Sequence, residues 1–213
     1  MQNLFSVSVA VAVMDPRLDQ GSLLAAEAGV VQKATASRIR EFTAGRVAAR
    51  VAMLAIGLPV LPVPSGPDRA PIWPQQISGS ISHCLDCCVA VVAPACDVAT
   101  LGIDVEACTP LDPDLFDIVF TSAEKNWLQL QAPEMQGYLA KLIFSAKETT
   151  YKCQYPLSGQ VLDFQAVEIN FDLKARRFGA VFKRDAAPFQ TGDKLVGAFD
   201  IVDQRFLTGM SLA

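Results

Sequence analysis

The 213-residue sequence has no apolar run that approaches the roughly 20 residues of a membrane-spanning helix. Its first 14 residues lack both the basic start and the small-residue cleavage site of a secretory signal peptide. An excess of positive charge is missing too, since the formal net charge is −4. We therefore expect a cytoplasmic protein that binds neither membranes nor nucleic acid through its overall charge.

Histidine is nearly absent, because His83 is the only one. Cys84, Cys87 and Cys88 follow it closely, but no second pair of ligands stands at the spacing of a zinc site. Ser82 precedes His83 directly, and adjacent residues do not readily pair as nucleophile and base, which argues against a Ser-His-Asp hydrolase. The six cysteines lie in apolar, strand-like or helical sequence, so we expect reduced, mostly packed thiols.

Hydrophobic periodicity predicts strands and helices in both halves of the chain. Residues 5–14 alternate with a period of two, which indicates a strand whose valines share one face. Residues 23–56 are rich in helix-forming residues and predict one long helix or two shorter helices. Six of the thirteen prolines fall between Pro59 and Pro74, so this stretch is predicted to be a connector without helix or central strand.

The rest of the chain continues this mixture of elements. Thr121 and Glu124 match the capping-box pattern and predict the start of a helix. A second helix is predicted from about Glu134 to Gln154, stopped before Pro156. Strands are predicted over residues 77–81, 89–93, 101–106, 166–171, 178–182, 195–202 and 206–212. Because strands and helices do not alternate strictly, we predict an α+β fold.

Two carboxylates in the middle of the chain are candidate metal ligands. Asp104 and Glu106 stand two residues apart, on the same face if their segment is a strand. Such a pair suits Mg²⁺, which prefers a few carboxylate oxygens together with substrate phosphates and water. Two solvated acids at the end of a strand give the same pattern, so this motif alone leaves both interpretations open.

The segment from Phe144 to Lys152 lies in an otherwise apolar and aromatic helix. Glu148 and Lys152 are four residues apart, so a carboxylate and an ammonium group share one helical face and can point together into a site. An ordinary ion pair on a helix surface has the same spacing and is the common explanation for such a pair. The context of the segment must therefore decide its role.

Three arginines share nearly one side of the first long helical segment. Arg46 and Arg50 are four residues apart, where like charges repel, and Arg38 precedes Arg46 by eight residues. A shared anion explains this clustering, because guanidinium groups bind phosphate and carboxylate strongly. Solvated arginines on an exposed helix face are the alternative.

These motifs, in this order, resemble a known family. Gly-Ile-Asp-x-Glu at 102–106 and Phe-Ser-x-Lys-Glu-x-x-x-Lys at 144–152 look like the signature pair of the 4′-phosphopantetheinyl transferases of the long, surfactin- and enterobactin-synthetase type. Further matches, to enterobactin-like and mycobacterial-like members, are the arginine series 38–50 and the segments 71–74, 79–84, 120–124 and 155–157. The sequence departs from the family at Thr149, usually Ala or Ser, and at Arg69 and Ala70, usually Gly-Lys or Gly-Glu.

The resemblance implies two similar α+β halves, residues 1–100 and 101–213, related by a pseudo-twofold axis with the active site in the cleft between them. It implies transfer of 4′-phosphopantetheine from coenzyme A to a serine of an acyl or peptidyl carrier protein, with Mg²⁺ as cofactor. The implied metal ligands are Asp104, Glu106 and Glu148, and the implied catalytic residues are Glu148, Lys152 and Asp104. Contacts with coenzyme A are implied for Arg38, Arg46, Arg50, Arg69, Ser82, His83, Asp104, Glu148, Lys152 and Leu162.

Individual roles follow from the same resemblance. Glu148 is expected to be the general base for the carrier serine, and Lys152 to stabilise the departing 3′,5′-ADP. Leu162, together with Leu157 and Phe164, is expected to line the pantetheine channel. The carrier protein is expected to dock on residues 108–120 through apolar contacts, because that segment carries three aspartates.

Two other classes of function remain open. One is a Mg²⁺-dependent phosphohydrolase or nucleotidyl enzyme acting on a small nucleotide. The other is a catalytically silent relative that only binds carrier proteins or coenzyme A, although the intact motif residues Asp104, Glu106, Glu148 and Lys152 argue against it. We expect a monomer, as in the long type of the family.

Overall fold

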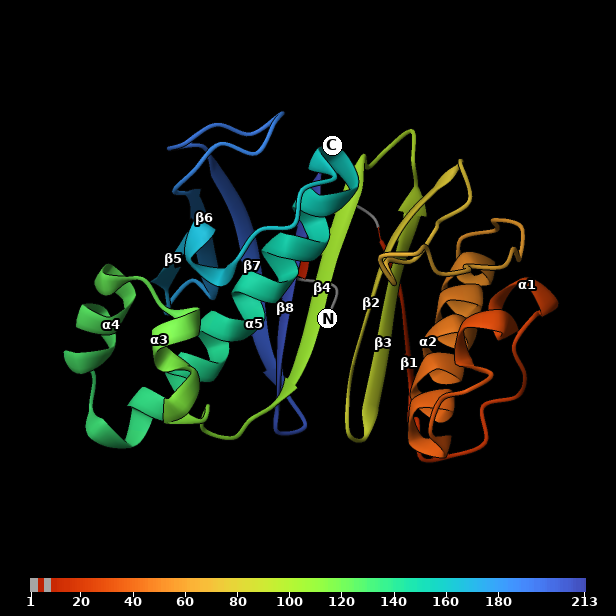
Figure 1. Cartoon of the computed structure of the whole chain (residues 1–213), viewed down its shortest axis with the longest axis horizontal. Helices are drawn as coiled ribbons and strands as arrows, with labels where there is room; N and C mark the ends of the chain where they lie inside the picture. The colour runs from red at the N-terminus through yellow and green to blue at the C-terminus, as the bar shows by residue number, and fades with distance from the viewer. Residues whose placement is uncertain (1–3, 6–8) are drawn as a thin grey trace.

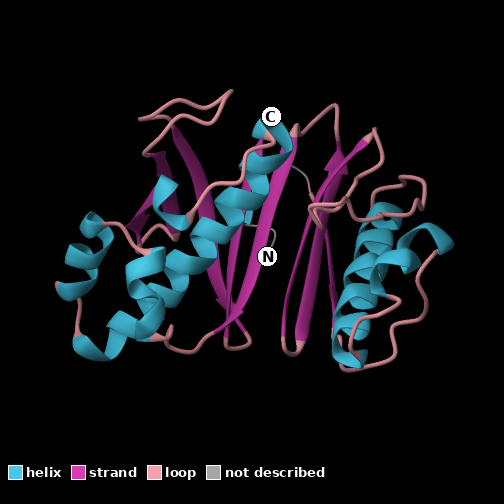
Figure 2. Ribbon diagram, viewed as in Figure 1, coloured by secondary structure: helices cyan, strands magenta, loops and turns pink. Residues whose placement is uncertain are grey.

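The computed structural model describes residues 4–5 and 9–213, which form two antiparallel sheets with helices packed against them (Figures 1 and 2). The three-stranded sheet has the order β1-β3-β2 and contains β1 (Ala10–Met14), β2 (Ile77–Cys84) and β3 (Cys87–Pro94). The five-stranded sheet has the order β4-β8-β7-β6-β5 and contains β4 (Thr100–Ala107), β5 (Val167–Asp172), β6 (Arg177–Phe182), β7 (Lys194–Val202) and β8 (Arg205–Leu212). All neighbouring strands of the two sheets are antiparallel, and the predicted α+β class is confirmed.

Each sheet is covered by one long helix (Figure 1). The helices are α1 (Ala25–Ala28), α2 (Ala36–Ala55), α3 (Phe116–Val119), α4 (Ser122–Gln129) and α5 (Pro133–Ser158), with 3-10 turns at Gly29–Val31, Pro113–Leu115 and Phe164–Ala166. Small side chains of α2, such as Ala48 and Ala52, pack on Ala90 and Val92 of β3 in one apolar cluster. Helix α5 lies across β4 and β8, and Ile143 belongs to the largest core cluster.

Helix α5 approaches strand β4 very closely. A Cβ atom at position 102 would collide with the carbonyl oxygen of Thr149, so only glycine permits this contact. The hydroxyl of Thr100 also donates a hydrogen bond to the carbonyl oxygen of Cys153, at 2.8 Å. The two signature segments, one on β4 and one on α5, are therefore neighbours in the fold.

Strands β2 and β4 join the two sheets side by side (Figure 1) through alternate serines of β2. The hydroxyl oxygen of Ser80 accepts a hydrogen bond from the backbone N–H of Ile103, at 3.2 Å, and that of Ser82 accepts from Val105, at 3.3 Å. Ser78 extends the row by donating to a backbone carbonyl just before β4. The row of hydroxyls satisfies backbone groups of β4 that a strand ladder would otherwise have to pair.

The predicted helix from Glu134 to Gln154 is longer at its C-terminal end. It continues through Pro156 to Ser158 and ends at Gly159, which has a left-handed φ of 62°. The prediction that the helix stops before Pro156 is therefore wrong, because a proline near the last turn removes only one backbone hydrogen bond. Of the predicted strand at 5–14, residues 10–14 form β1, whereas residues 6–8 lie outside the described residues.

Most of the other predicted elements are confirmed. The helical region 23–56 contains α1, a 3-10 turn and α2, and the proline-rich connector 59–74 has only an isolated bridge between Ser65 and Pro71. Thr121 and Glu124 form the predicted capping box at the start of α4. The three-stranded sheet lies before residue 100 and the five-stranded sheet after Ala99. A boundary between two halves at residue 100 and a pseudo-twofold axis stay predictions.

Two further expectations concern the whole chain. Among the described residues, no helix has the length and apolar character that crossing a bilayer requires. All six cysteines are free thiols, and Cys87, Cys88 and Cys153 are buried.

Candidate active site between the sheets

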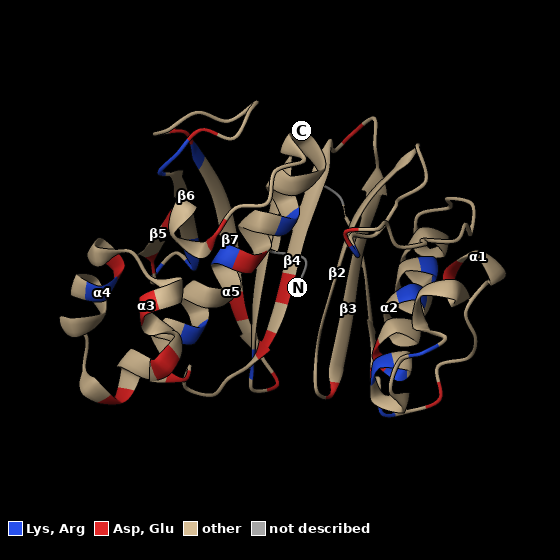
Figure 3. Ribbon diagram, viewed as in Figure 1, with Lys and Arg blue, Asp and Glu red and all other residues tan. Residues whose placement is uncertain are grey.

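A cavity of 630 Å³ lies between α2, the proline-rich connector, β2 and the last turns of α5. Its wall contains six residues that the sequence predicted at the coenzyme A site: Arg38, Arg46, Arg69, His83, Glu148 and Lys152. Figure 3 shows basic residues along α2 and neighbouring acidic and basic residues on α5. The fold thus brings cations from the first part of the chain against an acid and a lysine from the second.

Arg38 and His83 form one basic group of this wall. Nη1 of Arg38 lies 2.9 Å from Nε2 of His83, and Glu41 is 3.6 Å from Arg38 and 3.9 Å from Nδ1 of His83. Because a guanidinium group can only donate, Nε2 of the neutral imidazole accepts and the ring proton sits on Nδ1. Burial lowers the pKa of His83, partly opposed by Glu41, so the neutral form dominates at neutral pH.

Arg46 is a buried cation whose hydrogen-bond partners are neutral. The residue is 7% exposed, and its guanidinium group lies over the ring of Phe42 at 3.9 Å. It donates to the carbonyl oxygen of Val63 at 2.9 Å and to the hydroxyl of Ser65 at 2.8 Å. Burial lowers the pKa of Arg46 to about 10, so it stays protonated at neutral pH. In the described part of the chain it has no carboxylate within ion-pair distance, which leaves its charge available to an anion in the cavity.

Arg50 does not reach the cavity, contrary to the prediction. It binds Glu27 at 2.6 Å and the carbonyl oxygen of Ser22 at 2.7 Å. Glu27 is fully buried and also accepts a hydrogen bond from the backbone N–H of Val63, at 2.9 Å. The anion that explains the presence of Arg50 beside Arg46 is therefore this internal carboxylate.

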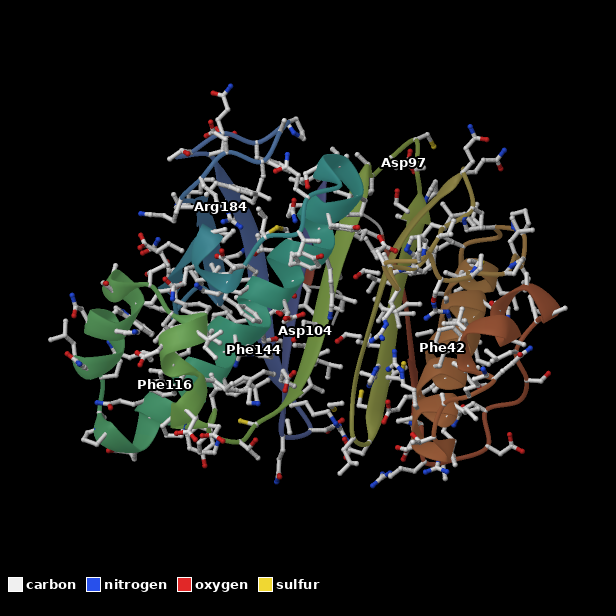
Figure 4. The ribbon with its side chains drawn as sticks, viewed as in Figure 1. Phe42, Asp97, Asp104, Phe116, Phe144 and Arg184 are labelled. Atoms are coloured by element: carbon white, nitrogen blue, oxygen red, sulfur yellow. The ribbon has the colours of Figure 1, made fainter. Side chains whose placement is uncertain are left out.

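Asp104 of β4, labelled in Figure 4, accepts hydrogen bonds at both carboxylate oxygens, from donors on β2 and α5. Its Oδ1 accepts from the hydroxyl of Ser82 and from Nζ of Lys152, both at 2.7 Å, and its Oδ2 accepts from the hydroxyl of Ser145 at 2.8 Å. Asp104 is 3% exposed and does not line the large cavity. Ser82, predicted to contact coenzyme A, is likewise buried behind the wall and instead orients Asp104.

The three predicted metal ligands, Asp104, Glu106 and Glu148, do not form a ready metal site. No group of three or more acidic, histidine or cysteine side chains in the described residues is placed to hold a metal ion. Glu106 pairs with Lys141 at 3.3 Å, and burial followed by the charge of Asp104 raises its pKa. Burial also raises the pKa of Glu148; Lys152 opposes this, while Asp104 and Glu106 add to it.

The charge of Asp104 helps to raise the pKa of Glu106 and of Glu148, which bears on whether these acids suit Mg²⁺. Carboxylates that lie close enough to repel gain from a shared cation, and carboxylate oxygen is the donor that Mg²⁺ prefers. The donor set of Asp104, Glu106 and Glu148 therefore fits the ion in its chemistry. At present Lys152 and Lys141 supply the positive charge around them.

Lys147, next to Glu148, has a structural position. Its ammonium group lies 2.8 Å from Glu124 and donates to the carbonyl oxygens of Phe164 and Val167, at 2.7 and 2.8 Å. Burial lowers the pKa of Lys147 and raises that of Glu124, while each charge opposes the shift of the other. The pair fixes α4, α5 and the segment before β5 relative to one another.

A second cavity of 380 Å³ adjoins the first. Leu162 and Phe164, two of the residues predicted to line a pantetheine channel, belong to its wall, whereas Leu157 is 41% exposed and lines neither cavity. Glu148 and Tyr151 line both cavities. A ligand that filled both would therefore pass beside the carboxylate of Glu148.

Sequence reasoning missed several aromatic residues of the large cavity. Phe42, Trp73, Tyr151 and Tyr155 all line it. Gly79 on β2 lies against the indole of Trp73, where a Cβ atom would be 2.5 Å from the ring. A glycine inside a strand often marks such a close approach, and the spacing of four between Tyr151 and Tyr155 places both on one helical face.

Comparison with known proteins identifies similar sequences over both sheets. A family model described as "4'-phosphopantetheinyl transferase N-terminal domain" matches residues 26–93, and one described as "4'-phosphopantetheinyl transferase superfamily" matches residues 100–198. The chain is 41% identical over 155 residues to 4'-phosphopantetheinyl transferase Svp of Streptomyces mobaraensis, covering 72% of this chain and 63% of that protein.

Two further relatives extend the comparison. Identity is 34% over 149 residues to 4'-phosphopantetheinyl transferase Npt of Nocardia iowensis, covering 70% of this chain and 66% of that protein. It is 32% over 146 residues to 4'-phosphopantetheinyl transferase PptT of Mycobacterium tuberculosis, covering 68% of this chain and 64% of that protein. The chain thus spans somewhat less than two thirds of the length of each of these relatives.

Proposed function

Because the chain belongs to the 4′-phosphopantetheinyl transferase superfamily, we propose that it transfers 4′-phosphopantetheine from coenzyme A to a serine of an acyl or peptidyl carrier protein. The observation that supports this most is the composition of the large cavity. Arg38, Arg46 and His83 line it on one side and Glu148 and Lys152 on the other. Coenzyme A has a 3′-phosphate and a pyrophosphate, which match two such groups of polar side chains.

The side of the cavity formed by Arg38, Arg46 and His83 binds the 3′-phosphate end of coenzyme A. Arg46 keeps its charge in a buried position with neutral partners, so a phosphate would be its natural counterion. Arg38 donates to His83 and is exposed enough to reach an incoming ligand. Arg69 lines the same cavity from the connector. Arg50 is paired with Glu27 and affects this site only by stabilising the fold.

The transfer step needs a base, a neutralised leaving group and an aligned nucleophile. The serine oxygen forms a bond to the phosphorus that carries pantetheine, and the bond from that phosphorus to the bridging oxygen breaks, which releases 3′,5′-ADP. Glu148 takes the proton of the serine hydroxyl, and its raised pKa makes it a stronger base than an ordinary glutamate. Lys152, at the wall of the cavity, neutralises charge on the leaving phosphate.

Mg²⁺ fits this proposal as the cofactor. When bound, it would neutralise the charge on the pyrophosphate, and Asp104, Glu106 and Glu148 are the residues that would hold it. The hydrogen bonds from Ser82 and Ser145 already orient Asp104 for such a role.

The smaller cavity suits the pantetheine arm. Leu162 and Phe164 give it an apolar wall. Because Glu148 and Tyr151 line both cavities, the arm and the nucleotide would meet at the reacting phosphate.

The carrier protein docks beside α3 in this proposal. Leu115 is 38% and Ile118 60% exposed, whereas Leu111 and Val119 of the same predicted surface are buried in the core. Asp117 is paired with Lys125 at 2.6 Å, which reduces the negative charge that would face an acidic carrier. The assembly proposed for the reaction is one copy of this chain with one carrier protein, in the cytoplasm.

Intact-mass spectrometry of an apo carrier protein incubated with coenzyme A and Mg²⁺ tests this function. Transfer adds the mass of phosphopantetheine to the carrier and releases one 3′,5′-ADP for each carrier modified. A phosphohydrolase would release nucleotide with no change in carrier mass, and a silent binding protein would do neither. Either of these results with several carrier proteins would contradict the proposal.

A further inference from the structure

Asp68 of the connector and Tyr155 of α5 touch across the wall of the large cavity. The hydroxyl of Tyr155 donates a hydrogen bond to Oδ2 of Asp68 at 2.5 Å, although the two residues are 87 positions apart in the sequence. Both residues line the cavity. In Figure 1 the connector runs between α2 and β2, and the contact joins it to the C-terminal turn of α5. Tyr155-Pro156-Leu157 is also a signature segment for which the transfer reaction supplies no role.

The connector folds into a tight loop that aims the carboxylate of Asp68. The backbone N–H of Gly66 donates to the carbonyl oxygen of Ala70 at 2.8 Å, and that of Arg69 donates to Gly66 at 2.9 Å. Oδ1 of Asp68 accepts from the N–H of Ala70 at 3.1 Å, which leaves Oδ2 for Tyr155. A Cβ atom at Gly66 would lie 2.6 Å from Oδ1 of Asp68, so any other residue there would displace the carboxylate from this position.

Arg69 is a residue of this loop that can contact a ligand in the cavity. It follows Asp68 directly, has a left-handed φ of 68° and lines the cavity. A non-glycine residue in this conformation persists only where surrounding contacts hold it. Contacts on both sides of Arg69, at Asp68 and Ala70, therefore hold its backbone at the edge of the cavity.

The loop is held firmly at its base and by one contact at its tip. Arg46 of α2 binds Val63 and Ser65 at the base. Within the described residues, the bond from Tyr155 to Asp68 is the one hydrogen bond between the connector and α5. Loss of that bond would free the tip and leave the base in place.

Tyr155 in turn is coupled to the reacting end of the site. Its ring stacks on that of Tyr151, with centroids 5.4 Å apart and planes 27° from parallel. Tyr151 lines both cavities together with Glu148. Pro156 has no N–H to donate within the last turn of α5, so the contact with Asp68 also restrains a turn that has lost one backbone hydrogen bond.

We propose that Asp68 and Tyr155 form a latch that positions Arg69 and controls how fast coenzyme A enters and leaves the large cavity. The identity of the ligand rests on the proposed function, whereas the latch itself rests on contacts within the chain. Opening the latch moves the loop tip away from α5, and closing it returns Arg69 to the cavity wall around the bound nucleotide.

Hydrogen exchange of the protein without ligand tests the latch directly. Tyr155→Phe keeps the ring and its stacking on Tyr151 but removes the hydroxyl, so amides of residues 65–71 are expected to exchange about three- to tenfold faster. Tyr138→Phe is the matched control, because Tyr138 is on the same helix but packs against Phe199 and Phe206, away from the cavity. Unchanged exchange in Tyr155→Phe would overturn the latch.

Stopped-flow measurement of coenzyme A binding tests its role. Tyr155→Phe should raise both the association and the dissociation rate by about three- to tenfold, and should have no further effect in an Asp68→Ala background, since the two residues act through one bond. Faster loop exchange with unchanged binding rates would overturn the gating role alone. A parental protein that does not bind coenzyme A would instead contradict the proposed function.

Discussion

Ser82 on β2 donates its hydroxyl hydrogen to Oδ1 of Asp104 on β4, at 2.7 Å. The same hydroxyl oxygen accepts from the backbone N–H of Val105 at 3.3 Å and from Nζ of Lys152 at 3.0 Å. One buried side chain therefore joins the two sheets and orients a carboxylate of the proposed metal site. Correct pairing of β2 with β4 and correct placement of Asp104 depend on the same contact.

Replacing Ser82 by alanine should reduce both stability and turnover. The change removes a hydrogen bond to a buried carboxylate, which costs about 1.5–3 kcal/mol of unfolding free energy. Ser78→Ala is the matched control, because Ser78 belongs to the same row of β2 serines and donates to the carbonyl oxygen of Val98, but neither touches Asp104 nor lines the large cavity. Urea unfolding together with single-turnover transfer should show stability loss in both variants and a loss of turnover in Ser82→Ala alone. Equal turnover in the two variants would mean that Ser82 only stabilises the contact between β2 and β4.

Glu148→Gln should lower turnover by about 10²-fold or more, because it removes the proposed base. The pKa of Glu148 is raised in the folded state, so the folded protein binds more protons than the unfolded chain between the two pKa values. The ionised carboxylate therefore lowers stability as pH rises through that range, and the variant should unfold at an equal or higher temperature at pH 7. Differential scanning fluorimetry across pH 3–8 would measure this difference.

The parental enzyme should also lose activity on the acid side as Glu148 becomes protonated. Glu134→Gln is the control, because Glu134 is an exposed residue in the first turn of the same helix. Its turnover and pH profile should equal those of the parental protein. Near-parental turnover of Glu148→Gln would assign Glu148 to a helix ion pair with Lys152.

Local elements could be predicted from the sequence because they depend on neighbouring residues. The Thr121 and Glu124 capping box, the proline-rich connector and the period-two alternation of β1 all act within a few residues. The pairing of β4 with β8, which sets Thr100 opposite Leu212, depends instead on long-range packing. No local pattern contains that information.

The candidate site also combines residues that could be predicted from the sequence with contacts that depend on long-range packing. Resemblance identified Arg38, Arg46, Arg69, His83, Glu148 and Lys152, which line the cavity. It did not distinguish Arg50, whose partner Glu27 lies 23 residues earlier and gives no signal in the helical spacing. A polar residue that binds a ligand and one that satisfies a buried group have the same one-letter pattern, so only the fold separates them.

Arg38→Ala should weaken coenzyme A binding by about tenfold or more, as expected for loss of a hydrogen bond to a phosphate. The same change should weaken the binding of dephospho-coenzyme A, which lacks the 3′-phosphate, much less. Arg40→Ala is the control, since Arg40 is exposed on the same helix and does not line the cavity. Calorimetric titration of both ligands gives the coupling between residue and phosphate. Equal losses for the two ligands would assign Arg38 another partner.

Native alkylation should leave transfer activity intact. Burial raises the pKa of Cys87 to about 11 and those of Cys88 and Cys153 to about 12, so their thiolates are scarce at neutral pH. Cys96 is the exposed cysteine and should be labelled first, as peptide mass mapping would show. Elemental analysis should find no zinc. Stoichiometric zinc, or loss of activity that follows labelling of Cys96, would contradict this view of the thiols.

Arg50→Ala should damage the fold and leave the coenzyme A site of folded molecules intact. The change leaves Glu27, which is fully buried, without its cationic partner, and breaking such a pair costs about 3–5 kcal/mol. Glu27 also binds the backbone of Val63, so part of the cost arises at the base of the connector. Urea unfolding would measure the loss directly.

Binding measured on the folded fraction separates this structural role from direct contact with the ligand. Arg50→Lys keeps the positive charge beside Glu27 and should recover much of the lost stability, although a lysine cannot reproduce the second bond to Ser22 in the same geometry. Coenzyme A affinity of both variants, corrected for the folded fraction, should stay within about twofold of the parental value. The opposite outcome is that Arg50→Ala loses as much coenzyme A affinity as Arg38→Ala and keeps its affinity for dephospho-coenzyme A. That result would show that Arg50 contacts the 3′-phosphate. Arg50 lies four residues after Arg46 on α2. The measurements therefore distinguish an arginine that neutralises the buried carboxylate of Glu27 from a neighbouring arginine that binds the ligand.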